Sequence, residues 1–168
     1  MALAPEIIRI FAGESYLDAI YVIPPIAASV YFVFIYSMFS TIEYYYQKTG
    51  LISIATSISA ILNLLLNYFG IKIWGYYAAG YTTLICYLCL TGFHYIFYKK
   101  IIKKELPKIK EIYDMRVMFL AGIFILVVMI IMVLLYKNIF IRYTVVLAIL
   151  VYAIIKRDKI KDILINLK

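Results

Sequence analysis

Long uncharged stretches separated by short clusters of charged residues dominate this chain of 168 residues. An α-helix rises 1.5 Å per residue, so it needs about 20 apolar residues to cross ~30 Å of hydrocarbon. Five stretches approach or exceed that length, namely residues 19–42, 51–71, 73–98, 117–136 and 138–155. His94 lies in the third stretch and Arg142 near the start of the fifth. Because a backbone in the membrane core must satisfy its own hydrogen bonds, the pattern predicts an all-α protein with five transmembrane helices.

Residues 1–18 have a different pattern, which is typical of a short amphipathic helix. Pro5 and Glu6 suit a first helical turn, and Gly13 can end the helix. The apolar face would consist of Ile7, Ile8, Ile10 and Phe11. A basic start is missing and Glu6 interrupts the apolar run, so the segment is not a signal peptide. We expect an interfacial helix followed by an outer loop.

The composition supports membrane residence, since 66% of the residues are apolar and 15% are charged. Soluble domains have about 45–50% and about 25% respectively. A soluble enzyme, a disordered chain and a nucleic-acid-binding module are therefore poor interpretations. The net charge of +8 comes from basic clusters that flank the uncharged stretches. That distribution indicates membrane lipids, and no nucleic acid, as the partner of the basic residues.

The basic residues also predict an orientation. Residues 1–18, Lys72, Lys137 and Arg142 would place four basic residues on one side. The other side would hold 13, contributed by Lys48, the loop 99–116 and the tail 156–168. Because cytoplasmic loops carry the excess of Lys and Arg, the N-terminus is expected outside and the C-terminus in the cytoplasm. The basic loop should also bind the anionic inner leaflet.

Two prolines lie in the outer part of the first stretch. Pro24 and Pro25 each lack a backbone donor and clash with the preceding turn of a helix. They predict a kinked helix beside a cavity, where freed carbonyl groups meet water or substrate. The alternative is that the regular helix begins at Pro24.

Polar residues on the second stretch form one helical face that includes Asn63 and Asn67. Such a face either packs against another helix or lines a vestibule for sugars. Lys72 and Trp74 follow in a short outer turn. A lysine beside aromatic rings suits a pyrophosphate and sugar rings, or it anchors the helix at the interface.

Glu43 and His94 are candidates for ion coupling or gating. Ionisable residues within membrane segments suggest function, and histidine side chains titrate near neutral pH. The alternative is that Glu43 belongs to an interfacial anchor together with the tyrosines that follow it, and that His94 reaches interfacial water.

Motifs for catalysis, metal binding and cofactor binding are absent from the sequence. Cys86 and Cys89 have C-x-x-C spacing, but they lie on a small-residue ridge and have no second cysteine pair. The sequence therefore predicts no catalytic residue, no metal and no cofactor, and a protein that is not an enzyme.

Several segments resemble one family of transporters. They are Pro5–Glu6–Ile7–Ile8, Phe11–Ala12–Gly13–Glu14–Ser15–Tyr16 with Pro24–Pro25, Ser40–Thr41–Ile42–Glu43–Tyr44–Tyr45, Leu62–Asn63–Leu64–Leu65–Leu66–Asn67 and Gly75–Tyr76–Tyr77–Ala78–Ala79. In combination they are similar to the tenth to twelfth helices of Wzx-type polysaccharide flippases. These flippases belong to the multidrug/oligosaccharidyl-lipid/polysaccharide exporter superfamily, which includes MATE-like transporters. The resemblance covers about residues 4–100.

The resemblance implies a function in a bacterial cytoplasmic membrane. Family members typically have fourteen helices, and this chain would supply the last five. It would then be part of a flippase that moves undecaprenyl-pyrophosphate-linked oligosaccharide outward, and inactive without the preceding helices. Substrate contacts would fall to Asn63, Asn67, Lys72 and Trp74, and coupling to Glu43 and His94. The alternatives are a fragment of a MATE-type multidrug exporter, or a small accessory or remnant membrane protein without transport activity.

Overall fold

The computed structural model describes residues 1–108 and 111–156, and every regular element within these ranges is helical. The elements are α1 (Ala4–Phe11), the 3₁₀ helix η1 (Glu14–Val22), α2 (Ile23–Tyr45), α3 (Thr49–Trp74), α4 (Ala78–Glu105), α5 (Met115–Leu135) and α6 (Ile139–Ile155). The predicted all-α class is therefore confirmed. The expected basic loop 99–116 and basic tail 156–168 are described only in part, because residues 109–110 and 157–168 lie outside these ranges.

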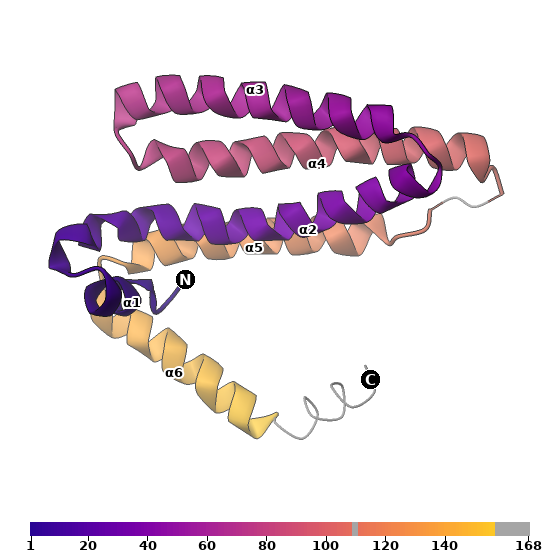
Figure 1. Cartoon of the computed structure of the whole chain (residues 1–168). Coiled ribbons are helices and arrows are strands. Elements are labelled where there is room, and N and C mark those ends of the chain that lie inside the picture. The colour runs from indigo at the N-terminus through magenta and orange to yellow at the C-terminus, as the bar shows by residue number, and fades with distance from the viewer. Residues whose placement is uncertain (109–110, 157–168) are drawn as a thin grey trace.

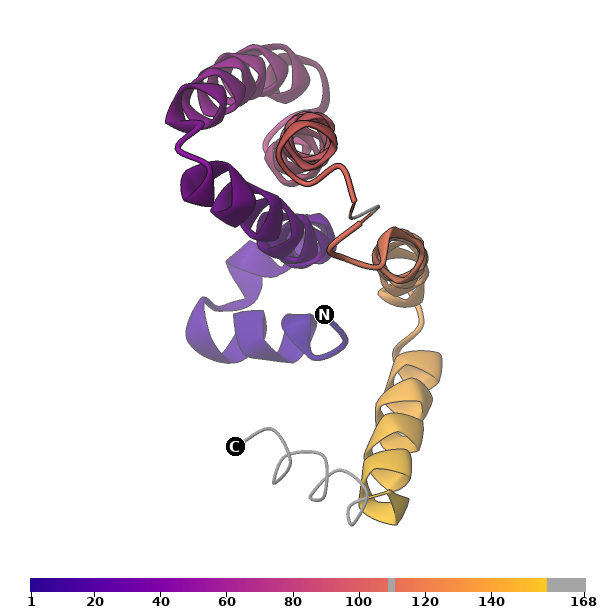
Figure 2. The same cartoon turned by 90° about the vertical axis from the view of Figure 1, so that its right-hand side faces the viewer.

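Four long helices lie side by side in the order α3, α4, α2 and α5 (Figure 1). Helix α4 packs against both α2 and α3, whereas α2 and α3 make few contacts with each other. Helix α5 covers another face of α2. Helix α6 leaves the end of α5 at an angle and points away from the four, as both views show (Figures 1 and 2).

Aromatic contacts join the connections at one end of the bundle, on the left in Figure 1. The Tyr21 ring meets the rings of Tyr77 and Tyr136 edge to face, at centroid distances of 6.5 Å and 5.9 Å. At the opposite end, the Tyr98 hydroxyl accepts a hydrogen bond of 2.9 Å from the backbone N–H of Ile112. Lys72 and the α5–α6 turn therefore lie at one end, and the loop after α4 lies at the other.

Three helical segments are long and apolar enough to cross a membrane, namely Glu14–Tyr45, Thr49–Trp74 and Met115–Leu135. Their large apolar side chains are widely exposed, for example Leu64 at 71% and Phe119 at 70%. Contiguous apolar surface of this kind is unfavourable in water and favourable in lipid. The chain therefore has the structure of a membrane protein.

The expected spans 73–98 and 138–155 lack the same support. Helix α4 has the length, but threonine, glycine, tyrosine and His94 lower its hydropathy. Because α2 and α3 cover it on two sides, less of its surface needs to suit lipid. In α6 the apolar segment that the described residues establish is shorter, Ile139–Ala148.

Pro24 and Pro25 lie in the first turn of α2, directly after η1. The prolines lie where the 3₁₀ helix changes to a regular α-helix, as expected if the regular helix begins at Pro24. They do not kink the interior of α2. Both prolines are buried, and α4 approaches them closely at Gly80. A Cβ atom on Gly80 would lie 2.9 Å from the Val22 carbonyl oxygen, so this crossing requires glycine.

Polar contacts join α1 and the N-terminal residue to the end of α5 and the start of α6. The Glu6 carboxylate forms an ion pair with Arg142 and accepts a hydrogen bond of 2.7 Å from the Tyr143 hydroxyl. The Tyr136 hydroxyl donates to the Met1 carbonyl oxygen at 2.8 Å.

Candidate functional site

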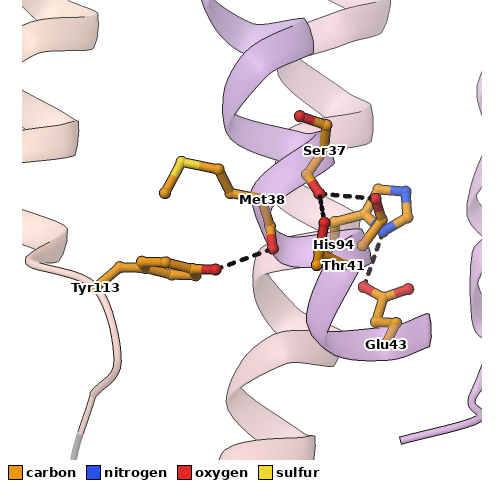
Figure 3. Close-up of polar contacts among 7 residues, drawn as sticks. Ser37, Met38, Thr41, Glu43, His94 and Tyr113 are labelled. Atoms are coloured by element: carbon orange, nitrogen blue, oxygen red, sulfur yellow. Dashed lines mark hydrogen bonds and ion pairs between the residues drawn. The ribbon is translucent and has the colours of Figure 1, made fainter. Parts of the chain in front are cut away.

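The candidate site is a buried acid–base pair between α2 and α4. The Glu43 Oε1 atom lies 2.8 Å from the His94 Nδ1 atom, and both side chains are fully buried (Figure 3). The two residues are 51 positions apart in the chain and meet because α2 and α4 pack along their length. The structure therefore brings together the two residues that the sequence nominated for ion coupling. Neither side chain is the solvent-exposed interfacial group of the alternative interpretation.

The pair contains polar atoms that could make further hydrogen bonds. Glu43 Oε2 and His94 Nε2 are buried, and neither makes a hydrogen bond within the described ranges 1–108 and 111–156. Leaving a buried polar atom without a partner costs about 1–3 kcal/mol. Replacing a buried ion pair by apolar residues of similar volume is often neutral or stabilising. Packing alone therefore does not explain the pair, and one oxygen and one nitrogen remain for a proton, a water molecule or a ligand.

Aromatic rings extend the pair toward the middle of the helices. The Tyr36 ring stacks on His94 at 5.5 Å, and the Tyr87 ring stacks on Tyr36 at 6.2 Å. Tyr36 and Glu43 are seven residues apart on α2, and Tyr87 and His94 are seven apart on α4. This spacing puts each pair on one helical face. The rings fix the plane of the imidazole, and so they fix the direction of Nε2.

A second polar cluster joins α3 to α4. The Asn67 amide donates to the Asn63 side-chain oxygen at 3.0 Å, and the Thr82 hydroxyl lies 2.5 Å from the Asn67 side-chain oxygen. The same hydroxyl also lies 3.0 Å from the Ala78 carbonyl oxygen. The asparagine face is thus used, at least in part, for helix packing, as one of the two interpretations expected.

Lys72 and Trp74 are both exposed at the end of α3. They lie beside the short α3–α4 turn, at the opposite end of the bundle from Glu43 (Figure 1). The structure therefore separates the residues proposed for substrate contact from the residues proposed for coupling. Within the described ranges, no group of three or more His, Cys, Asp or Glu residues could hold a metal ion.

A groove of about 600 Å³ runs between α2, α4 and α5. Its walls are mostly apolar, with Phe32, Ile35 and Phe39 from α2 and Leu126 from α5. The Arg116 side chain lines it at the end where α5 begins. This groove could not be identified from the sequence, because it forms from three helices that are each apolar for other reasons.

Three residues of the two polar clusters were also missed. Tyr36 and Tyr87 carry no motif, although their seven-residue spacing from Glu43 and His94 could have nominated them. Thr82 was recognised only as part of a small-residue ridge, and its contact with Asn67 depends on the relative rotation of α3 and α4.

No family model, no curated protein and no solved structure matches this chain. The resemblance to polysaccharide flippases therefore rests on the quoted segments alone.

Proposed function

We propose that this chain is part of a proton-coupled flippase that moves a lipid-linked oligosaccharide across a bacterial cytoplasmic membrane. In this proposal α2 to α6 are five transmembrane helices, with α1 outside and the loop after α4 in the cytoplasm. The substrate is an undecaprenyl-pyrophosphate-linked repeat unit for surface polysaccharide. Further helices, as the family resemblance implies, complete the transport path.

The observation that carries the proposal is the buried Glu43–His94 pair. Both groups can exchange a proton, and they come from two different helices, α2 and α4. A proton that binds at the pair changes the charge exactly where the two helices meet, in a region with no solvent contact. Such a change favours one relative position of α2 and α4 over another, which is what alternating access requires.

The membrane potential can supply enough energy to shift the equilibrium between two positions of α2 and α4. Moving one charge through the membrane potential supplies about 2.3 kcal/mol per 100 mV. A bias of that size shifts a two-state equilibrium by roughly fiftyfold, because 1.4 kcal/mol corresponds to a factor of ten. Proton entry at one side and release at the other would therefore drive a conformational cycle.

Lys72 and Trp74 are the proposed substrate contacts on the outer side. An ammonium group attracts a pyrophosphate, and an exposed indole ring can stack on a sugar. Asn63 and Asn67 are half-buried and would reach the sugar only after α3 and α4 separate enough to release Thr82. We therefore assign the contact between these amides and the sugar to a state in which α3 and α4 have separated.

Deletion of the gene in its native host tests the proposal. Lipid-linked repeat units should accumulate in the inner leaflet, and surface polysaccharide should fall. Wild-type protein and the exposed-site control Glu111→Gln should restore the polymer, whereas Glu43→Gln should not, although it is made at a normal level. Unchanged polysaccharide in the deletion strain would refute the flippase.

A second candidate is a cation-coupled multidrug exporter of the same superfamily. The buried carboxylate of Glu43 favours it, because such exporters are expected to couple through intramembrane acids. The deletion strain would then become sensitive to cationic drugs and keep its polysaccharide. A strain unchanged in both respects would indicate the accessory or remnant membrane protein.

A further inference from the structure

The groove between α2, α4 and α5 is a second site, distinct from the Glu43–His94 pair. We propose that it binds one anionic phospholipid taken from the leaflet on the basic side of the bundle. The apolar walls would hold an acyl chain, and Arg116 would hold the phosphate. This inference requires only that the protein resides in a membrane, and it does not depend on the transported substrate.

The depth of the groove matches one leaflet. On α5 the lining extends from Met115 to Leu126, which corresponds to about 16 Å at 1.5 Å per residue. The hydrocarbon core of a bilayer is ~30 Å thick, so the groove reaches about its middle. A site that ends there suits a lipid of one leaflet better than a solute that crosses both.

Two polar side chains in the wall, Tyr31 and Thr91, are already hydrogen-bonded within the protein. The Tyr31 hydroxyl donates to the Met118 carbonyl oxygen at 2.6 Å. The Thr91 hydroxyl lies within hydrogen-bond distance of two carbonyl oxygens, those of Phe32 at 3.1 Å and Tyr87 at 2.8 Å. The wall therefore offers apolar contact to an occupant, as a hydrocarbon chain requires.

The mouth of the groove holds one charged lining residue, Arg116, beside the α5 N-terminus that Asp114 caps. Arg116 is exposed and pairs with no carboxylate in the described part of the chain. The Lys99 ammonium group lies 5.0 Å from the centre of the ring of Tyr95, a residue that also lines the groove. Asp114 caps the α5 N-terminus by accepting hydrogen bonds from the backbone N–H groups of Arg116 and Val117. Because these N–H groups are occupied, the headgroup would be held by side chains.

Gly92 provides a way to fill the groove. It lines the groove on α4, and a Cβ atom added there meets nothing within 4 Å. Gly92→Leu should therefore place a side chain where the acyl chain would lie, without displacing a neighbouring helix. The same change favours the helix, because glycine is about 1 kcal/mol worse than alanine in a helical interior.

Native mass spectrometry of the full chain in detergent tests the site, with phosphatidylglycerol and phosphatidylcholine of identical acyl chains added in equal amounts. Phosphatidylglycerol should be retained about fivefold to tenfold more, and Arg116→Gln should abolish that preference. Lys103→Gln, which removes an exposed charge outside the groove lining, should preserve it. Gly92→Leu should abolish retention of both lipids.

Three results would overturn the inference. They are equal retention of the two lipids by the wild type, unchanged retention in Gly92→Leu, and displacement of phosphatidylglycerol by equimolar undecaprenyl phosphate, which would make the groove a carrier-lipid site. If circular dichroism shows that Gly92→Leu is misfolded, Ile123→Trp fills the groove from α5 and gives the same decision. Glu43→Gln should keep the lipid preference, so failure of the coupling proposal would not be mistaken for failure of this one.

Discussion

The Glu43–His94 pair predicts an unusual pattern of stability when it is replaced by leucine, one residue at a time and together. His94→Leu leaves a fully buried carboxylate without its partner. Glu43→Leu leaves a buried imidazole with two unpaired nitrogens. The double variant leaves neither, and leucine has a volume that the α2–α4 interface can accept. Each single change should therefore destabilise the protein more than both changes together.

The magnitudes follow from the complete burial of both groups. Removing one partner of a buried charged pair costs about 3–5 kcal/mol, and leaving a neutral polar group unpaired costs about 1–3 kcal/mol. We expect His94→Leu near the first range and Glu43→Leu near the second. The double variant should lie within about 1 kcal/mol of the wild type, because apolar replacements of buried pairs are often neutral.

Unfolding in mixed micelles, followed by far-UV circular dichroism, measures the four free energies at one pH. With a double variant close to the wild type, the coupling energy of the cycle should be about 4–8 kcal/mol in magnitude, above the range of about 0.5–3 kcal/mol seen for most contacting residues. Glu111→Leu, at an exposed carboxylate, should change the stability by less than about 0.5 kcal/mol. Additive effects of Glu43→Leu and His94→Leu would show that the two side chains do not interact, and the coupling proposal would lose its basis.

Four other changes follow from the packing and the hydrogen bonds. Gly80→Ala should destabilise the bundle by about 1–2 kcal/mol because its Cβ atom meets the Val22 carbonyl, whereas Gly92→Ala should stabilise it by up to about 1 kcal/mol; thermal unfolding in detergent compares the two. Thr82→Val should cost about 0.6–1.7 kcal/mol in the same assay, through the lost contact with Asn67. Tyr136→Phe removes the contact with the Met1 carbonyl oxygen, so amide hydrogen exchange within residues 1–18 should become faster.

Much of the fold could be predicted because long uncharged stretches have few structural solutions. The absence of charge located the segments of α2, α3 and α5, and it identified the class. The same criterion also selected residues 73–98 and 138–155, and α4 and α6 are helices there, but only three helical segments of the described part are long and apolar enough to be confirmed as candidate spans. The polar residues of α4 are tolerated because α2 and α3 cover them. The role of the prolines was ambiguous because proline fits the first turn of a helix without loss of stability and fits a helix interior only at a cost in stability.

The site could be nominated in parts but not assembled. Glu43 and His94 were each notable as ionisable residues beside apolar stretches, yet their contact depends on how α2 and α4 are rotated and shifted along each other. The groove depends on three helices at once, and its residues are individually ordinary. Residue type therefore predicted the candidate chemistry, whereas tertiary packing determined which candidates meet.

The two sites share one helix in a way that links them physically. Helix α4 contributes His94 to the buried pair, and Gly92 and Tyr95, its near neighbours, to the groove. Phe39 of α2 lines the groove and is four residues from Glu43. A relative movement of α2 and α4 would therefore change the pair and this end of the groove together, because adjoining turns of the two helices contribute to both. A lipid that fills the groove would stabilise one of these positions, and in the proposed transport cycle it would act on the same equilibrium as a proton at Glu43–His94. Glu43→Gln would then change the total retention of lipid and keep the preference between phosphatidylglycerol and phosphatidylcholine, because Arg116 sets that preference.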